Sequence, residues 1–71
     1  MEKTKRYWHG DIKSTDDLGL PIDNVFIDGA TTMGPWAIMS PVSHKRYGRG
    51  LGVGVGQRYE KQPDGKWLKT K

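Results

Sequence analysis

Residues 47–59 read YGRGLGVGVGQRY, and every even position from Gly48 to Gly56 is glycine. A run of this kind belongs either to a phosphate-binding loop or to a strand with one bare face. The dinucleotide fingerprint needs glycines at i, i+2 and i+5, and an odd offset cannot occur among glycines that are all even-numbered. A P-loop needs Gly-Lys followed by Ser or Thr, which the run lacks. The spacing therefore excludes both phosphate motifs.

A spacing of two is the side-chain period of a β-strand. It predicts a strand with Leu51, Val53 and Val55 on an apolar face and bare backbone on the other face. Glycine weakens a strand, so a bare face indicates that another group approaches it closely. We expect an indole ring, from Trp36 or Trp8, to cover this face. The alternatives are the backbone of a neighbouring chain, a ligand or a nucleic-acid backbone.

The segment SPVSHKRYG, residues 40–48, predicts a helix of about two turns over residues 41–47. Ser40 can cap the first free amides, and Pro41 suits the first helical position, where its missing N–H is not needed. Basic residues in the last turn interact favourably with the negative end of the helix dipole. We expect Gly48 to end the helix in a left-handed conformation.

Short segments of apolar and β-branched residues predict further strands. They are NVFI at residues 24–27 and WAIM at residues 36–39, which we expect to pair as a hairpin. The Asp28-Gly29 dipeptide is expected to bound the first of them. RYWHGDI, residues 6–12, predicts another short strand.

A last hairpin is predicted for EKQPDGKW, residues 60–67. Pro63 fits the second position of a type I turn, and Gly65 supplies the positive φ that closes a three-residue loop. The resulting register pairs Lys61 with Trp67 and Tyr59 with Lys69, which places Tyr59 and Trp67 on the apolar face of the glycine strand.

These elements predict one small, mostly-β domain over residues 1–71, with two β-hairpins and one short helix, and a disordered tail at residues 1–5. The chain has no cysteine, so disulfides and thiolate zinc sites are excluded. A domain of this size needs tight aromatic packing or self-association for stability, and we expect both, including a possible homodimer. No apolar run approaches the roughly 18 residues of a membrane span. The expected location is the cytoplasm.

The charge is divided along the chain. Residues 1–44 carry four Lys or Arg and six Asp or Glu, a net charge of −2, whereas residues 45–71 carry eight and two, a net charge of +6. The two halves can attract each other within or between chains, or the basic half can bind nucleic acid. Basic and aromatic residues alternate in the basic half, as in nucleic-acid-binding surfaces. The candidate nucleic-acid-binding residues are Arg46, Tyr47, Arg49, Arg58, Lys61 and Lys66.

No catalytic constellation is evident, and we expect neither an enzyme nor a cofactor. Ser43 and His44 are neighbours in sequence, which does not by itself create a nucleophile and base. His9, His44 and an aspartate are a conceivable metal site, but the sequence favours no metal.

The stretch from Phe26 to Lys69 resembles small phage-encoded proteins of unknown function. These proteins carry Gly-Pro-Trp-Ala, then Cys-x-x-Cys, then a glycine-rich strand ending in Gly-Gln-x-Tyr, and an earlier Cys-x-x-Cys precedes Gly-x-Pro-Ile. Here the corresponding segments are GPWA at residues 34–37, YGRGLGVGVGQRY at residues 47–59 and GLPI at residues 19–22. The resemblance implies a zinc-ribbon-like β architecture, a phage origin and location in the bacterial host.

The cysteine positions of that family correspond to Thr15, Leu18, Ser40 and Ser43. Serine and threonine are poor zinc ligands and leucine is none, so the resemblance implies the fold without the metal. The leading hypothesis is a non-enzymatic binding protein that contacts DNA or RNA through its basic half. The alternative is a protein-interaction module that binds or inhibits a host protein; an enzyme ranks last.

Overall fold

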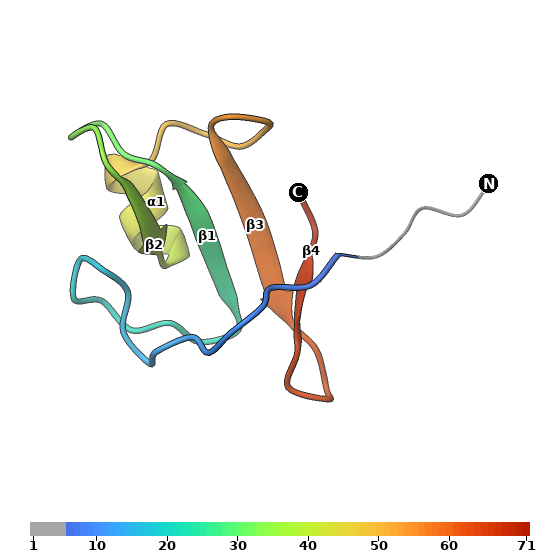
Figure 1. The fold of residues 1–71 in the computed structure, drawn as a ribbon. Coiled ribbons are helices and arrows are strands. Elements are labelled where there is room, and N and C mark those ends of the chain that lie inside the picture. The colour runs from blue at the N-terminus through green and yellow to red at the C-terminus, as the bar shows by residue number, and fades with distance from the viewer. Residues whose placement is uncertain (1–5) are drawn as a thin grey trace.

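The computed structural model describes residues 6–71, so the predicted tail at residues 1–5 lies outside the described residues. Four antiparallel strands form one sheet in the order β2-β1-β3-β4, and one short helix follows β2 (Figure 1). The predicted small, mostly-β fold with one short helix is therefore confirmed. The elements are β1 (Val25–Ala30), β2 (Trp36–Met39), α1 (Pro41–Tyr47), β3 (Gly56–Lys61) and β4 (Trp67–Lys69).

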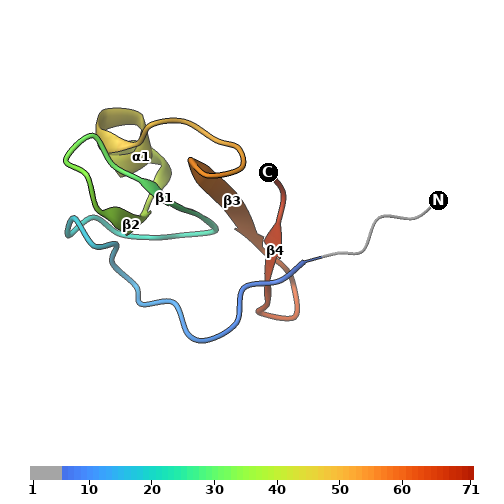
Figure 2. The same cartoon turned by 45° about the horizontal axis from the view of Figure 1, so that its top comes forward.

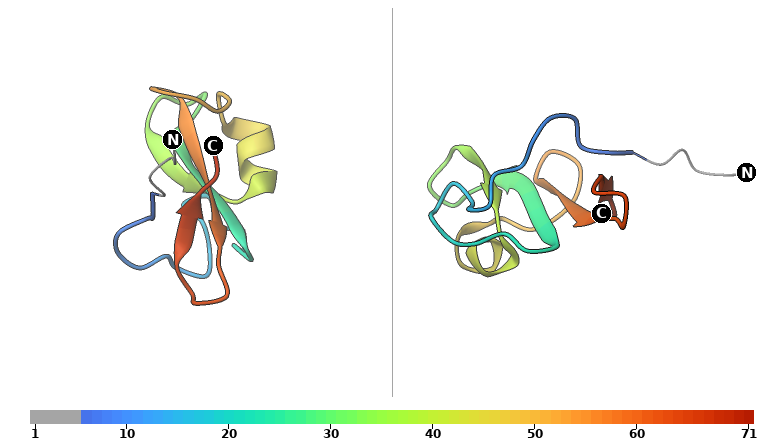
Figure 3. Two further views of the ribbon diagram at one scale, coloured as in Figure 1. Left: turned by 90° about the vertical axis from the view of Figure 1, so that its right-hand side faces the viewer. Right: turned by 90° about the horizontal axis from the view of Figure 1, so that it is seen from below.

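The sheet lies between α1 and the N-terminal segment, which cover its opposite faces (Figures 2 and 3). Alternation along β1 points Phe26 to one face and Ile27 to the other. Phe26 is fully buried and packs against Trp8 of the N-terminal segment. Ile27 is buried with its cross-strand partner Met39 on the side of α1. The core is therefore small and divided between the two faces.

β1 and β2 form the predicted hairpin, but β1 does not end at Asp28-Gly29. It continues to Ala30, and Gly29 pairs with Gly56 of β3. A Cβ atom on Gly29 would lie 2.9 Å from the Val55 carbonyl oxygen. Glycine here permits a close approach between two backbones instead of ending the strand.

α1 begins as predicted, because the Ser40 side chain accepts a hydrogen bond of 3.2 Å from the Ser43 amide. The predicted left-handed end is wrong. Gly48 has φ −76° and ψ 159°, an extended conformation open to any residue. Glycine is required at this position because a side chain would not fit: a Cβ atom on Gly48 would overlap the His44 imidazole.

The predicted strand over the glycine run is also wrong. Gly50, Gly52 and Gly54 have φ values of 111°, 134° and 77°, so the chain turns there instead of extending, and β3 starts only at Gly56. The turn closes on itself, because the Gly52 and Gly56 amides each donate to the other residue's carbonyl oxygen. Glycine adopts a positive φ at little conformational cost. The predicted apolar face does not form, and Val53 is 99% exposed.

The expected indole cover is wrong, because neither Trp36 nor Trp8 provides the nearest neighbours of Gly50, Gly52, Gly54 or Gly56. A Cβ atom on Gly56 would lie 2.9 Å from the Gly50 carbonyl oxygen and 3.4 Å from the Gly29 Cα atom. Trp36 is 47% exposed, and Trp8 packs against Phe26 instead. The close neighbours of Gly56 are therefore backbone atoms of the same chain.

The last hairpin has the predicted register, with Lys61 paired to Trp67 and Tyr59 paired to Lys69. Gly65 has φ 88°, as the turn requires. The predicted strand at residues 6–12 is partly correct, because residues 6–8 alone pair with β4. The Trp8 amide donates to the Trp67 carbonyl at 2.9 Å, and the Lys69 amide donates to the Arg6 carbonyl at 2.8 Å.

The outer edge of β2 is covered by the loop that contains Asp16 and Asp17. The Asp17 amide donates to the Ile38 carbonyl at 2.9 Å, and the Asp17 carboxylate accepts from the Ile38 amide at 2.8 Å. Together the two bonds satisfy the backbone N–H and C=O of Ile38, as pairing with a neighbouring strand would. An uncovered edge would invite pairing with another chain, so this loop protects the sheet.

Candidate nucleic-acid interface

The face of the sheet under the N-terminal segment carries a cluster of four aromatic rings. Phe26 and Tyr59 stack with centroids 5.0 Å apart, and Trp67 meets Phe26 edge-on at 4.9 Å. Trp8 lies across both Phe26 and Tyr59, at 5.3 and 5.5 Å. Phe26 is fully buried, whereas the other three rings are half-buried. The cluster therefore belongs to the core and still presents aromatic surface to solvent.

Cationic side chains lie among these rings. The β3–β4 register places Lys61 and Lys69 on the same face as Tyr59 and Trp67. Lys61 Nζ lies 6.0 Å from the Trp67 ring centroid, within the range of a cation–π contact. The aromatic–cationic face, as we name it, consists of Arg6, Trp8, Tyr59, Lys61, Trp67 and Lys69.

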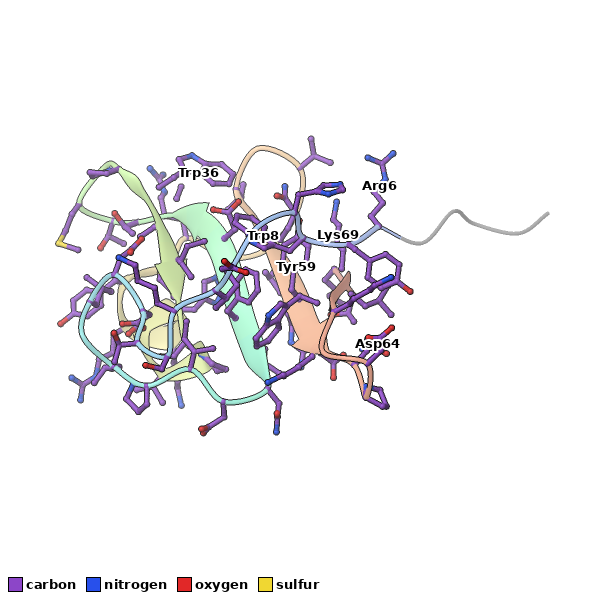
Figure 4. The ribbon with its side chains drawn as sticks, turned by 60° about the horizontal axis from the view of Figure 1, so that its bottom comes forward. Arg6, Trp8, Trp36, Tyr59, Asp64 and Lys69 are labelled. Atoms are coloured by element: carbon purple, nitrogen blue, oxygen red, sulfur yellow. The ribbon has the colours of Figure 1, made fainter. Side chains whose placement is uncertain are left out.

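A cavity of about 620 Å³ opens on this face where the N-terminal segment passes beside β3 and β4 (Figure 4). Two permanent cations, an imidazole, two tyrosines and one amide line it, and none of the described lining residues carries a carboxylate. The lining residues are Arg6, Tyr7, His9, Gln57, Tyr59 and Lys69. This set of side chains suits an anionic ligand that also offers hydrogen-bonding groups.

The electrostatics at the border of the cavity keep Tyr59 protonated. Burial, first, and the negative charge of Asp28, second, raise the pKa of Tyr59 above its ordinary value of 10.0, while the nearby Arg6 charge opposes them. Burial and the charge of Asp17 also raise the pKa of Asp28 above 3.8. Tyr59 therefore offers a hydroxyl donor throughout the neutral range.

No family model matches the chain, and no curated protein or solved structure was found to match it. No helix in residues 6–71 has the length and apolar character needed to span a bilayer.

The six residues predicted to bind nucleic acid do not form one surface. Lys61 belongs to the aromatic–cationic face, and Lys66 lies in the adjacent turn, with Nζ 5.8 Å from the Tyr7 ring centroid. Arg58 points to the opposite face, where it bonds Glu60 and Thr70, both at 3.0 Å.

The other three, Arg46, Tyr47 and Arg49, lie at the opposite end of β3. Arg46 and Tyr47 belong to the end of α1, and Arg49 to the loop that enters β3 (Figure 1). The β3–β4 turn, with Lys66, lies at the far end of the same strand. The basic half of the sequence is therefore divided between two regions of the surface.

The cavity is lined by several residues that were not among the predicted ones: Arg6, Tyr7, His9, Gln57 and Lys69. The signal for Lys69 was present, because the predicted register had already placed it opposite Tyr59. Arg6 and His9 lie in the acidic half of the chain. Only the pairing of residues 6–8 with β4 brings them to this face.

The conceivable metal site of His9, His44 and an aspartate is not assembled in the described part of the chain. His9 lines the cavity, whereas His44 lies on α1, across the sheet, with Nε2 2.9 Å from the Gly50 carbonyl oxygen. No group of three metal-ligating side chains occurs among residues 6–71.

Three of the four positions that the resemblance aligns with cysteine, Leu18, Ser40 and Ser43, lie around the Asp16 carboxylate. One oxygen accepts hydrogen bonds from the Leu18 and Leu20 amides at 2.9 and 2.8 Å, and the other accepts from the Ser40 amide at 2.8 Å. The fully buried Ser43 hydroxyl also faces this carboxylate. A buried anion therefore connects the two segments.

Proposed function

We propose that this protein is a non-enzymatic nucleic-acid-binding module that uses its aromatic–cationic face. The observation that supports this proposal is the alternation of permanent cations and half-buried rings on one face of β3, β4 and residues 6–8. Lysine and arginine neutralise phosphates, and aromatic rings offer surfaces on which bases stack. This combination is typical of surfaces that bind nucleic acid with little sequence preference.

Within residues 6–71, no carboxylate forms an ion pair with the cations on this face. Among the described residues the one ion pair joins Arg58 to Glu60, and it lies on the opposite face. Lys61 and Lys69 are diagonal neighbours on adjacent strands, which places their backbones about 7–8 Å apart. With Arg6, they supply three cations along one continuous surface.

The first experiment is binding of labelled single- and double-stranded DNA and RNA at about 50 and about 200 mM salt. Neutralising three phosphates weakens binding of a single strand roughly 20-fold across that range. A variant with Lys61→Gln and Lys69→Gln loses two charges but keeps polar side chains. Its slope of log affinity against log salt is expected to be shallower by about 1.4.

The matched control is Arg46→Gln with Arg49→Gln, which removes two charges at the opposite end of β3. We expect it to leave the salt slope unchanged. The proposal is wrong if binding is undetectable at low salt, or if the control lowers the slope and the lysine variant does not. Thermal unfolding of each variant verifies that the fold is intact.

A further inference from the structure

We propose that the cavity beside Tyr59 holds one unpaired nucleotide, so that the aromatic–cationic face binds single strands in preference to duplexes. This inference rests on the proposed function and names the form of nucleic acid that the site takes.

The size of the cavity is the first reason. Its volume of about 620 Å³ lies within the range of roughly 300–1,000 Å³ that is usual for small-molecule sites. A phosphate group alone would leave most of this space unfilled. A nucleotide, with base, sugar and phosphate, fills it better.

The lining offers separate partners for the phosphate and for the base. Arg6 presents a planar guanidinium, which binds phosphate oxygens through two parallel hydrogen bonds, and Lys69 adds a second charge. Gln57 presents an amide, which both donates and accepts and so matches the edge of a base. The Tyr59 hydroxyl adds a further donor.

Among residues 6–71, these polar groups take part in no side-chain hydrogen bond. On β3, the side-chain hydrogen bonds within the described residues are made by Arg58 and Glu60, on the face toward α1. Gln57 and Tyr59 make none and line the cavity on the opposite face. Within the described part of the chain, no side chain competes with a ligand for the Gln57 amide or the Tyr59 hydroxyl.

A duplex fits this site poorly. Its bases are stacked and paired, so it presents mainly phosphates to a recessed cavity, whereas an unpaired base can leave the stack and expose its face and its edge. The half-buried ring of Tyr59 lines the cavity, and the Trp8 ring lies beside it with centroids 5.5 Å apart. Lys61, on the same face, lies beyond the cavity and favours a strand over a free nucleotide.

The experiment compares single and double strands of the same sequence, with the variant Gln57→Ala and the matched control Gln62→Ala. Gln62 carries the same amide but lies after β3 and bonds the Glu60 carbonyl. We expect single strands to bind at least about fivefold more tightly than duplexes and Gln57→Ala to remove most of this difference. The salt slope stays unchanged in this variant, because glutamine carries no charge.

Each other outcome has a distinct meaning. Equal affinity for single strands and duplexes, with a salt slope that still depends on Lys61 and Lys69, overturns the inference and leaves the proposed function intact. An equal effect of Gln57→Ala and Gln62→Ala also overturns the inference. Absence of binding to any nucleic acid overturns both.

A titration with uridine and adenosine monophosphates, followed by NMR of the Gln57 side-chain amide, separates a strand from a free nucleotide. We expect binding much weaker than that of the strand, and inorganic phosphate alone should shift this amide less. A mononucleotide affinity equal to that of the strand overturns the inference, because the ligand is then a free nucleotide.

Discussion

The Asp16 carboxylate accepts a hydrogen bond of 2.8 Å from the Ser40 amide, which lies 24 residues further along the chain. Its second oxygen accepts from the Leu18 and Leu20 amides, so one side chain joins the acidic loop to the junction of β2 and α1. Burial by itself would raise the pKa of Asp16. The amides of Ser40 and Leu20, together with the neighbouring Ser43 and Ser40 hydroxyls, prevail and hold the pKa of Asp16 at about 2.

The first prediction is that Asp16→Asn destabilises the protein at neutral pH. The pKa of Asp16 falls from 3.8 to about 2 on folding, which corresponds to about 2 kcal/mol of stability. This contribution is complete above pH 3.8 and is lost as the pH falls through about 2. Thermal unfolding at neutral and acidic pH measures it: the difference between wild type and variant should be large at pH 7 and small near pH 2. A pH-independent difference would contradict this prediction.

The second prediction is that Asp28→Asn stabilises the protein at neutral pH. Burial raises the pKa of Asp28, and the charge of Asp17 adds to it, so the folded state disfavours the ionised form. This penalty is absent below pH 3.8 and grows as the pH rises through the raised pKa. The unfolding temperature of the variant should therefore exceed that of the wild type at pH 7 and equal it near pH 3.

The Asp28→Asn variant also tests the environment of the cavity. The negative charge of Asp28 contributes to the raised pKa of Tyr59. Ultraviolet titration should show one tyrosine that ionises at lower pH in the variant than in the wild type. Tyr59→Phe identifies which tyrosine it is. An unchanged titration curve would place Asp28 too far from Tyr59.

The third prediction concerns the close approach at Gly56. An added Cβ atom would lie 2.9 Å from the Gly50 carbonyl oxygen and 3.4 Å from the Gly29 Cα atom. Both are backbone atoms, which cannot rotate away as a flexible side chain can. Gly56→Ala should therefore lower the free energy of unfolding by about 1–3 kcal/mol in a denaturant titration. Val53→Ala is the control in the same loop, and since Val53 is 99% exposed, it should change stability by less than about 0.5 kcal/mol.

The fourth prediction is that Gly48→Ala destabilises the end of α1 through His44. The new Cβ atom would overlap the His44 imidazole, and it would lie 2.7 Å from the His44 carbonyl oxygen. Replacing His44 by alanine removes the ring but not the carbonyl. The double variant should therefore recover part of the lost stability, and a double-mutant cycle measures the coupling. Strict additivity of the two substitutions would show that the ring contributes nothing to the strain.

The predicted nucleic-acid-binding residues lie in two separate regions of the fold. Of the predicted residues, Lys61 and Lys66 lie on or beside the β3–β4 hairpin, whose register was predicted correctly. Arg46 and Arg49 were predicted on the same ground of charge, but Arg46 lies at the end of α1 and the Arg49 amide bonds the Ala30 carbonyl, near the start of β3. Charge counted along a sequence does not reveal which residues share a surface, because that depends on strand order and on which face each side chain occupies.

The sequence by itself determined the helix at Pro41–Tyr47 and the hairpin around Gly65. Their signals act over a few residues: the Ser40 cap bonds the Ser43 amide, and the turn closes between Gln62 and Lys66. Such contacts need no distant partner, so they can be read directly from adjacent residues.

Tertiary structure alone decided the backbone conformation of the glycine run and the role of the loop that contains Asp16 and Asp17. Glycine accepts both signs of φ at little cost, so a period of two among glycines does not enforce an extended chain. The conformation follows from contacts with Gly29 and His44 of other elements. Asp16 and Asp17 likewise found their partners, the backbone amides of Ser40 and Ile38, only when the loop reached the edge of β2.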